Sequence, residues 1–147
     1  MLRRSRVDDL KIICFDPGTV RIGAAISDES EFISRPLGFI KNDERLERLL
    51  KELAIKEPFG RIIVGNPLNM DGTKNPRTTH GDILAEKLKA FFPEVPLEMW
   101  DERLSTADAE EIMIMTNVSR KKRKKKIDSL AAALILQSYL DSRGRRK

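Results

Sequence analysis

The chain has 147 residues, enough for one domain over 1–147 with its own hydrophobic core, and 35% of them are charged. The formal net charge of +5 is concentrated in seven consecutive basic residues at 120–126, which suits a polyanionic partner such as nucleic acid. A single cysteine, Cys14, excludes an internal disulfide framework and favours a reducing cytoplasmic compartment, and the longest apolar run, 130–136, is too short to cross a membrane.

Three short strands are expected at the start of the chain. The apolar run at 12–15 predicts a buried strand that ends at Asp16, where Pro17 and Gly18 turn the chain. Further apolar runs at 21–28 and 32–40 predict two more strands in an antiparallel meander. Asp16 alone has two interpretations, since an aspartate at a strand end either binds a ligand at the sheet edge or forms the turn itself.

Helices and buried strands alternate in the middle of the chain. Leucines at helical spacing after Asn42, the expected N-cap, predict a helix that Pro58 ends. The next predicted elements are a strand at 61–65, a loop or small hairpin at 66–76, a helix at about 78–92 and a strand at 97–100.

The last part of the chain predicts two helices separated by the basic residues. Ser105 and Asp108 have the spacing of a capping box, so a helix is expected to begin there. The basic segment 120–126 is expected to be a mobile loop, with the last helix running from about 127 to 141. This order of elements predicts a three-layer α/β fold with a mixed sheet.

Acidic residues fall at the ends of two predicted strands and in the first turn of the last helix. Asp16 ends the first strand and Asp101-Glu102 ends the fifth, while Asp128 shares a helix face with Ala132 and should face the protein body. Each also has an ordinary interpretation, as a turn former, a residue ahead of a helix cap or a charge near a helix N-terminus. Together the positions favour one acidic cluster.

Carboxylates brought together in a partly dry cleft repel one another, and a divalent cation relieves that repulsion. Their hard oxygen ligands suit Mg²⁺ or Mn²⁺. Two such ions about 3.5–4 Å apart can clamp the attacking and leaving oxygens of a phosphodiester. The single histidine, His80, cannot supply a histidine-rich zinc site.

Four segments in register resemble the YqgF family, also called RuvX, whose members are described as Holliday junction resolvases or pre-16S ribosomal RNA nucleases. The resemblance covers nearly the whole chain, where one segment alone would be a weak signal. The segments are Asp-Pro-Gly-Thr-Val-Arg-Ile-Gly-Ala-Ala at 16–25, Val-Gly-Asn-Pro-Leu-Asn-Met-Asp-Gly-Thr at 64–73, Asp-Glu-Arg-Leu-Ser-Thr at 101–106 and Ile-Asp-Ser-Leu-Ala-Ala at 127–132.

The resemblance implies an RNase H-like fold with a five-stranded mixed sheet in the order 3-2-1-4-5, the first three strands antiparallel, and helices on both faces. It implies a catalytic, metal-binding site made of Asp16, Asp128 and one acid of the Asp101-Glu102 pair, for which we favour Glu102. The fourth strand ends without an acid, unlike the RuvC resolvases, so the second ligand's role passes to the fifth strand. Val20 stands where many relatives carry lysine.

Nucleic-acid contacts are expected around these acids. Gly18 and Thr19 would let the backbone approach a phosphate, whereas Arg21 and Arg103 either hold the phosphate or brace the acids as ion pairs. The loop 67–76 could close on a bound strand. The predicted phosphate-binding residues are Gly18, Thr19, Arg21, Asn69, Arg103, Arg120, Lys121, Lys122, Arg123, Lys124, Lys125 and Lys126.

Three functions remain open from the sequence. The first is a metal-dependent nuclease for structured nucleic acid, with pre-16S rRNA 5′-end processing or Holliday junction resolution as its task. The second is a non-catalytic nucleic-acid-binding protein with the same fold. The third is a nucleotide-binding module of the actin and sugar-kinase type, although such proteins use two domains and 147 residues supply one. The sequence fits a monomer or a homodimer.

Overall fold

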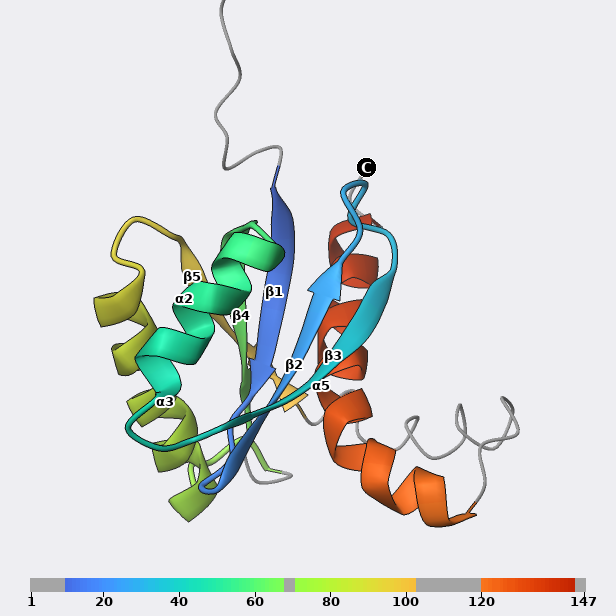
Figure 1. The fold of residues 1–147 in the computed structure, drawn as a ribbon. Coiled ribbons are helices and arrows are strands. Elements are labelled where there is room, and N and C mark those ends of the chain that lie inside the picture. The colour runs from blue at the N-terminus through green and yellow to red at the C-terminus, as the bar shows by residue number, and fades with distance from the viewer. Residues whose placement is uncertain (1–9, 68–70, 103–119, 145–147) are drawn as a thin grey trace, which may run out of the picture.

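The structure is a computed structural model, and it describes residues 10–67, 71–102 and 120–144, with the backbone alone at 77 and 120–129. Figure 1 shows its five strands and three helices in the described ranges. The strands are β1 (Lys11–Asp16), β2 (Arg21–Ser27), β3 (Ser34–Lys41), β4 (Phe59–Asn66) and β5 (Leu97–Asp101). The helices are α2 (Leu46–Lys56), α3 (Pro76–Phe91) and α5 (Arg120–Gly144).

The five strands form one mixed sheet in the order β3-β2-β1-β4-β5. β1, β2 and β3 pair antiparallel, whereas β4 lies parallel to β1 and β5 lies parallel to β4. The predicted strand order and directions are therefore confirmed. Because β1, β4 and β5 run the same way, their carboxyl ends meet at one edge of the sheet.

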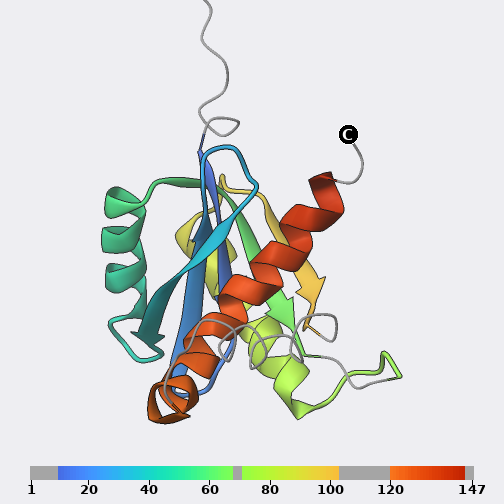
Figure 2. The same cartoon turned by 90° about the vertical axis from the view of Figure 1, so that its right-hand side faces the viewer.

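Helices cover both faces of this sheet, as Figures 1 and 2 show from two sides. Successive side chains of a strand point to opposite faces, so β1 places Ile13 and Phe15 against α2 and α3. Its alternate residues Ile12 and Cys14 pack with α5 instead. A strand that is buried on both faces needs a continuous apolar run, which explains the composition of β1 and β4.

Two predicted boundaries were wrong because side chains make contacts that the periodicity does not reveal. Asn42 does not cap α2, whose N-cap Arg45 has no side-chain hydrogen bond; Asn42 Nδ2 donates instead to the carbonyl of Gly18 at 2.9 Å. β3 begins at Ser34 rather than at residue 32, because the Asp28 carboxylate accepts hydrogen bonds from the Phe32 and Ile33 amides.

The predicted loop at 120–126 was also wrong, since the backbone there belongs to α5. Arginine and lysine have helix propensities close to that of alanine, and the segment contains no glycine or proline that would separate it from the helix behind it. The predicted end of α2 before Pro58 is confirmed. The helix expected to begin at Ser105 lies outside the described residues. None of the described helices is long and apolar enough to span a bilayer.

Candidate acidic site

Polar side chains stand at the carboxyl ends of the three parallel strands. Asp16 is the last residue of β1, Asn66 of β4 and Asp101 of β5. The register pairs Phe15 with Val64 and Asn66 with Asp101, so these ends lie side by side at one edge of the sheet. In open α/β sheets this edge is where ligands are commonly bound.

Glu102 follows β5 directly and lies over Gly65 of the neighbouring strand. A Cβ built on Gly65 would stand 2.8 Å from Glu102 Oε2 and 2.9 Å from Ile135 Cδ1 of α5. The Glu102 carboxylate therefore occupies the space that a side chain at position 65 would fill. The absence of a side chain at Gly65 lets this acid reach from β5 across β4, on the face of the sheet that α5 covers.

Asp16 faces the same way. It is two residues after Cys14, which packs with α5, and alternate residues of a strand share a face. Burial raises the pKa of the Cys14 thiol, and the negative charges of Asp16 and Glu102 raise this pKa further. One buried thiol therefore lies within electrostatic reach of both carboxylates, although the two acids are 86 positions apart in numbering.

The oxygens at this edge suit a hard cation. Asp16 Oδ1, Asn66 Oδ1 and Glu102 Oε2 are each buried from solvent. Within the described part of the chain, Asn66 Oδ1 accepts no hydrogen bond, and a buried acceptor in that state costs about 1–3 kcal/mol. The carboxylates of Asp16 and Glu102 lie on the α5 face and supply oxygens that fit Mg²⁺ or Mn²⁺. Asn66 follows Gly65 and is paired with Asp101, so its side chain starts toward the other face of the sheet. Among the described side chains, no cluster of three His, Cys, Asp or Glu residues is positioned to hold a metal ion.

Asp101 and Glu102 differ in orientation. Trp100 packs in the cluster on the α5 side, so strand alternation directs the next residue, Asp101, toward the opposite face. Glu102 lies with Ile135 on the α5 side. This geometry favours Glu102 as the second acid, and the assignment remains a prediction.

Asp128 lies in the backbone of α5, and its side chain is outside the described residues. Ala132 and Ile135 follow it by about one and two helical turns, and both are buried. Asn69 and Arg103 also lie outside the described residues, as do the side chains of the basic segment 120–126.

A cavity of about 260 Å³ begins at Asp16 and follows the β1–β2 turn. A Cβ at Gly18 would stand only 2.1 Å from the carbonyl oxygen of Arg21, so only glycine fits this turn. Asn42, the residue after β3, holds this turn in place. Its backbone N–H donates to Val20 O, and its side-chain Nδ2 donates to Gly18 O. The cavity is lined by Asp16, Pro17, Gly18, Thr19, Val20, Arg21, Gly23 and Phe39.

The structure thus brings Asp16, Gly18, Thr19 and Arg21 together around one cavity, and their contact with a phosphate stays a prediction. Asn42 and Asn66 were missed as parts of this edge. Asn66 could have been noticed as the residue that ends the fourth strand, whereas Asn42 is connected to the turn only by the folded chain.

The chain is similar to one protein family and to several bacterial proteins over most of its length. Residues 10–142 match the family RuvX, described as Holliday junction resolvase. A protein of Geobacillus kaustophilus named as a pre-16S rRNA nuclease is 46% identical over 138 residues, covering 91% of this chain and 99% of the relative. A Bacillus subtilis protein of the same name is 40% identical, covering 90% of this chain and 99% of the relative.

Solved structures share the fold at low sequence identity. Thermus thermophilus RuvC in complex with a Holliday junction substrate is 16% identical with a TM-score of 0.57, and the match covers 92% of this chain and 96% of that one. The fowlpox virus Holliday junction resolvase is 18% identical with a TM-score of 0.53, covering 90% and 99%. At these identities the likeness shows the RNase H-like fold alone.

Proposed function

The chain belongs to the RuvX family, and from this membership and its acidic site we propose that it is a nuclease that hydrolyses phosphodiester bonds of structured nucleic acid. The observation that carries the proposal is the convergence of Asp16 and Glu102 at one edge of the sheet, on the face that α5 covers. Acids directed at a common edge have a clear use in binding cations near a phosphate.

The substrate is a precursor of 16S rRNA, whose 5′ end the protein trims during ribosome biogenesis, or a four-way DNA junction. The first task is supported by the names of relatives that are 40–46% identical, and the second by the description of the family. The single buried cysteine suits the reducing cytoplasm. A monomer or a homodimer would serve either substrate.

Asp16, Glu102 and Asp128 would hold Mg²⁺ or Mn²⁺, and Asp101 at the end of β5 is the alternative to Glu102. The carboxylates of Asp16 and Glu102 fit these ions because they supply hard oxygens on one face of the sheet. When bound, such ions lower the pKa of an attacking water and stabilise the charge on the departing oxygen, in the manner of a two-metal phosphodiesterase.

The chain's own groups bind and orient the nucleic acid around this site. The Gly18 turn allows its backbone close to a phosphate, and Thr19 and Arg21 line the same cavity as Asp16. Asn69, Arg103 and the basic segment 120–126 would neutralise further phosphates. The basic segment ends two residues before Asp128 on α5, so it can guide the phosphate backbone toward the acids.

The proposal is tested by cleavage of a pre-16S rRNA transcript and a four-way DNA junction with Mg²⁺ or Mn²⁺. Asp16→Asn should lower the rate by at least about 100-fold, the scale expected on removing one preorganised electrostatic group, while nucleic-acid binding persists. The matched control is Glu98→Gln, because Glu98 also lies on β5 and accepts a hydrogen bond from Tyr139. It should cleave at the normal rate.

Equal cleavage by Asp16→Asn would contradict the assignment of the acidic site and would indicate a contaminating nuclease. Binding without cleavage by the unsubstituted protein would favour the alternative function, a non-catalytic nucleic-acid-binding protein.

A further inference from the structure

Phe39 stands apart from the other aromatic side chains of the chain. Phe32 is exposed beyond the opposite end of β2, and Phe39 lines the cavity that begins at Asp16. The remaining six belong to the two hydrophobic clusters of the core, which do not include Phe39: Phe15, Phe59, Phe91, Phe92, Trp100 and Tyr139. An aromatic ring that the core does not use therefore lies beside the acidic site.

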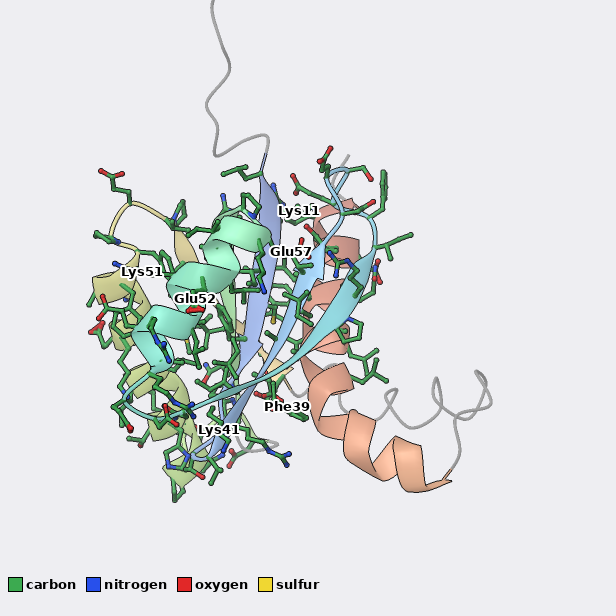
Figure 3. All side chains as sticks on the ribbon, viewed as in Figure 1. Lys11, Phe39, Lys41, Lys51, Glu52 and Glu57 are labelled. Carbon is green, nitrogen blue, oxygen red and sulfur yellow. The ribbon has the colours of Figure 1, made fainter. Side chains whose placement is uncertain are left out.

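The sheet register fixes this position. Asp16 of β1 is paired with Gly23 of β2, and Gly23 is paired with Phe39 of β3. Residues directly opposite one another across neighbouring strands share a face of the sheet. Because Gly23 has no side chain, none stands between the Asp16 carboxylate and the Phe39 ring in this row. Figure 3 shows Phe39 toward the end of the sheet at which β1 ends.

Arg21 completes the arrangement. Its guanidinium carbon lies 4.5 Å from the centroid of the Phe39 ring, a cation–π contact. Arg21 is exposed and lines the same cavity of about 260 Å³. The ring and the guanidinium together present planar surfaces, and the positive charge of the guanidinium attracts phosphate.

We propose that Phe39 and Arg21 form a platform that stacks an unpaired base of the nucleotide next to the scissile phosphate. Aromatic rings and arginine planes are the surfaces on which single-stranded bases stack in proteins. A base inside a duplex has both faces covered by its neighbours, so the platform selects substrates that are unpaired or opened at this nucleotide. The inference rests on the proposed nuclease function and adds a preference for an unpaired nucleotide at the cut.

The test is a double-mutant cycle between the protein and the nucleic acid. Binding is measured by fluorescence anisotropy with Asp16→Asn protein, which should not cleave, on single-stranded RNA and on four-way DNA junctions. One abasic nucleotide is moved through each probe. At one position, loss of the base should weaken binding by about 5- to 150-fold, the range expected for one stacked base.

In the Asp16→Asn background, Phe39→Leu should bind the intact probe as weakly as the abasic one, because leucine offers no ring on which the base can stack. Phe39→Trp keeps an aromatic face and should retain the sensitivity to the missing base. The matched control is Phe32→Leu, the same substitution at an exposed aromatic residue beyond the other end of β2. Its affinity for the intact probe and its loss of affinity for the abasic probe should equal those of the protein that keeps Phe32.

A purely structural role for Phe39 would lower the melting temperature of Phe39→Leu and leave the sensitivity to the abasic position intact. That outcome, or a probe series with no sensitive position, would overturn the platform while leaving the nuclease in place. Failure of the proposed function gives a different result, because the unsubstituted protein would then cleave none of the probes, whether or not it binds them.

Discussion

At the scale of single residues, the acidic site depends on a missing side chain. Gly65 lies inside β4 and its φ is not positive, so its backbone conformation does not require glycine. It is needed because Glu102 Oε2 and Ile135 Cδ1 fill the space where its Cβ would lie. The position therefore couples the chemistry of Glu102 to the packing of α5.

Gly65→Ala should displace the Glu102 carboxylate and push against α5. Overpacking of this kind costs about 1–3 kcal/mol of the free energy of unfolding, and cleavage should fall with it because Glu102 loses its position. Urea denaturation and the cleavage rate measure the two effects. An alanine variant with normal stability and normal cleavage would show that Glu102 is not held over position 65.

Gly81→Ala is the matched control, since Gly81 lies in α3 with its nearest neighbours at 3.4–3.6 Å, an ordinary contact distance. Alanine is favoured over glycine inside a helix by about 0.5–1 kcal/mol, so this variant should be as stable as the unsubstituted protein or more so.

Asp16 could be predicted from the sequence because an apolar run followed by Pro17-Gly18 marks the end of a buried strand. The choice between Asp101 and Glu102 could not be made from adjacent positions, since it depends on which face each side chain takes after β5. Phe39 could not be found at all, because only the register through Gly23 brings β3 beside Asp16.

At the scale of elements, one helix, α5, contains both the basic segment 120–126 and an apolar segment that packs on the sheet. Its later part packs on the sheet through small residues, with Ala132 fully buried and Ala133 4% exposed. Its first turns carry the basic segment 120–126 on a continuous helix. The charge pattern indicated a solvated loop, but the high helix propensity of lysine and arginine allows the helix to extend through these residues.

Neutralising part of this segment should weaken nucleic-acid binding without unfolding α5, because alanine is the best helix former. The dependence of log Kd on log salt concentration should flatten by about 0.9 for each duplex phosphate that the protein no longer neutralises. The variant replaces Lys121, Lys122 and Lys125 with alanine. The charge-matched control also replaces three lysines with alanine, at exposed positions of α2 and α3: Lys51, Lys56 and Lys89. An equal drop in affinity in both triple variants would show that net charge alone, and not this segment, drives binding.

At the scale of the whole molecule, the order of strands could be predicted from the family resemblance, and periodicity predicted most of the elements. The same sheet carries two cores, one under α2 and α3 and one under α5. Charged side chains tie the sheet to α2 at the end remote from the acids. Glu57 accepts hydrogen bonds from Arg35 Nη2 at 2.7 Å and from Lys11 Nζ at 3.3 Å, which joins β3 and β1 to the end of α2 (Figure 3).

The hydrogen bond from Arg35 lowers the pKa of Glu57 below its ordinary value of 4.5, and Lys11 adds to this effect against the opposing influence of burial. A lowered folded-state pKa stabilises the protein above the ordinary value, and this stabilisation is lost as the pH falls through the folded-state pKa. Glu57→Gln should therefore cost less than about 1 kcal/mol at pH 7, as expected for an ion pair at the protein surface whose Arg35 side chain is exposed.

The stability difference between Glu57→Gln and the unsubstituted protein should disappear in the acid range below 4.5, as followed by urea denaturation at several pH values. A difference that stays constant or grows on acidification would mean that Glu57 is not ionised and paired in the folded protein.

The central claim is that Asp16 and Glu102, distant in sequence, hold a cation together, and Mn²⁺ binding followed by electron paramagnetic resonance tests it most directly. The unsubstituted protein should bind Mn²⁺, Asp16→Asn and Glu102→Gln should each lose most of that affinity, and Glu98→Gln on the same strand should keep it. Equal Mn²⁺ affinity in all four proteins would contradict the account.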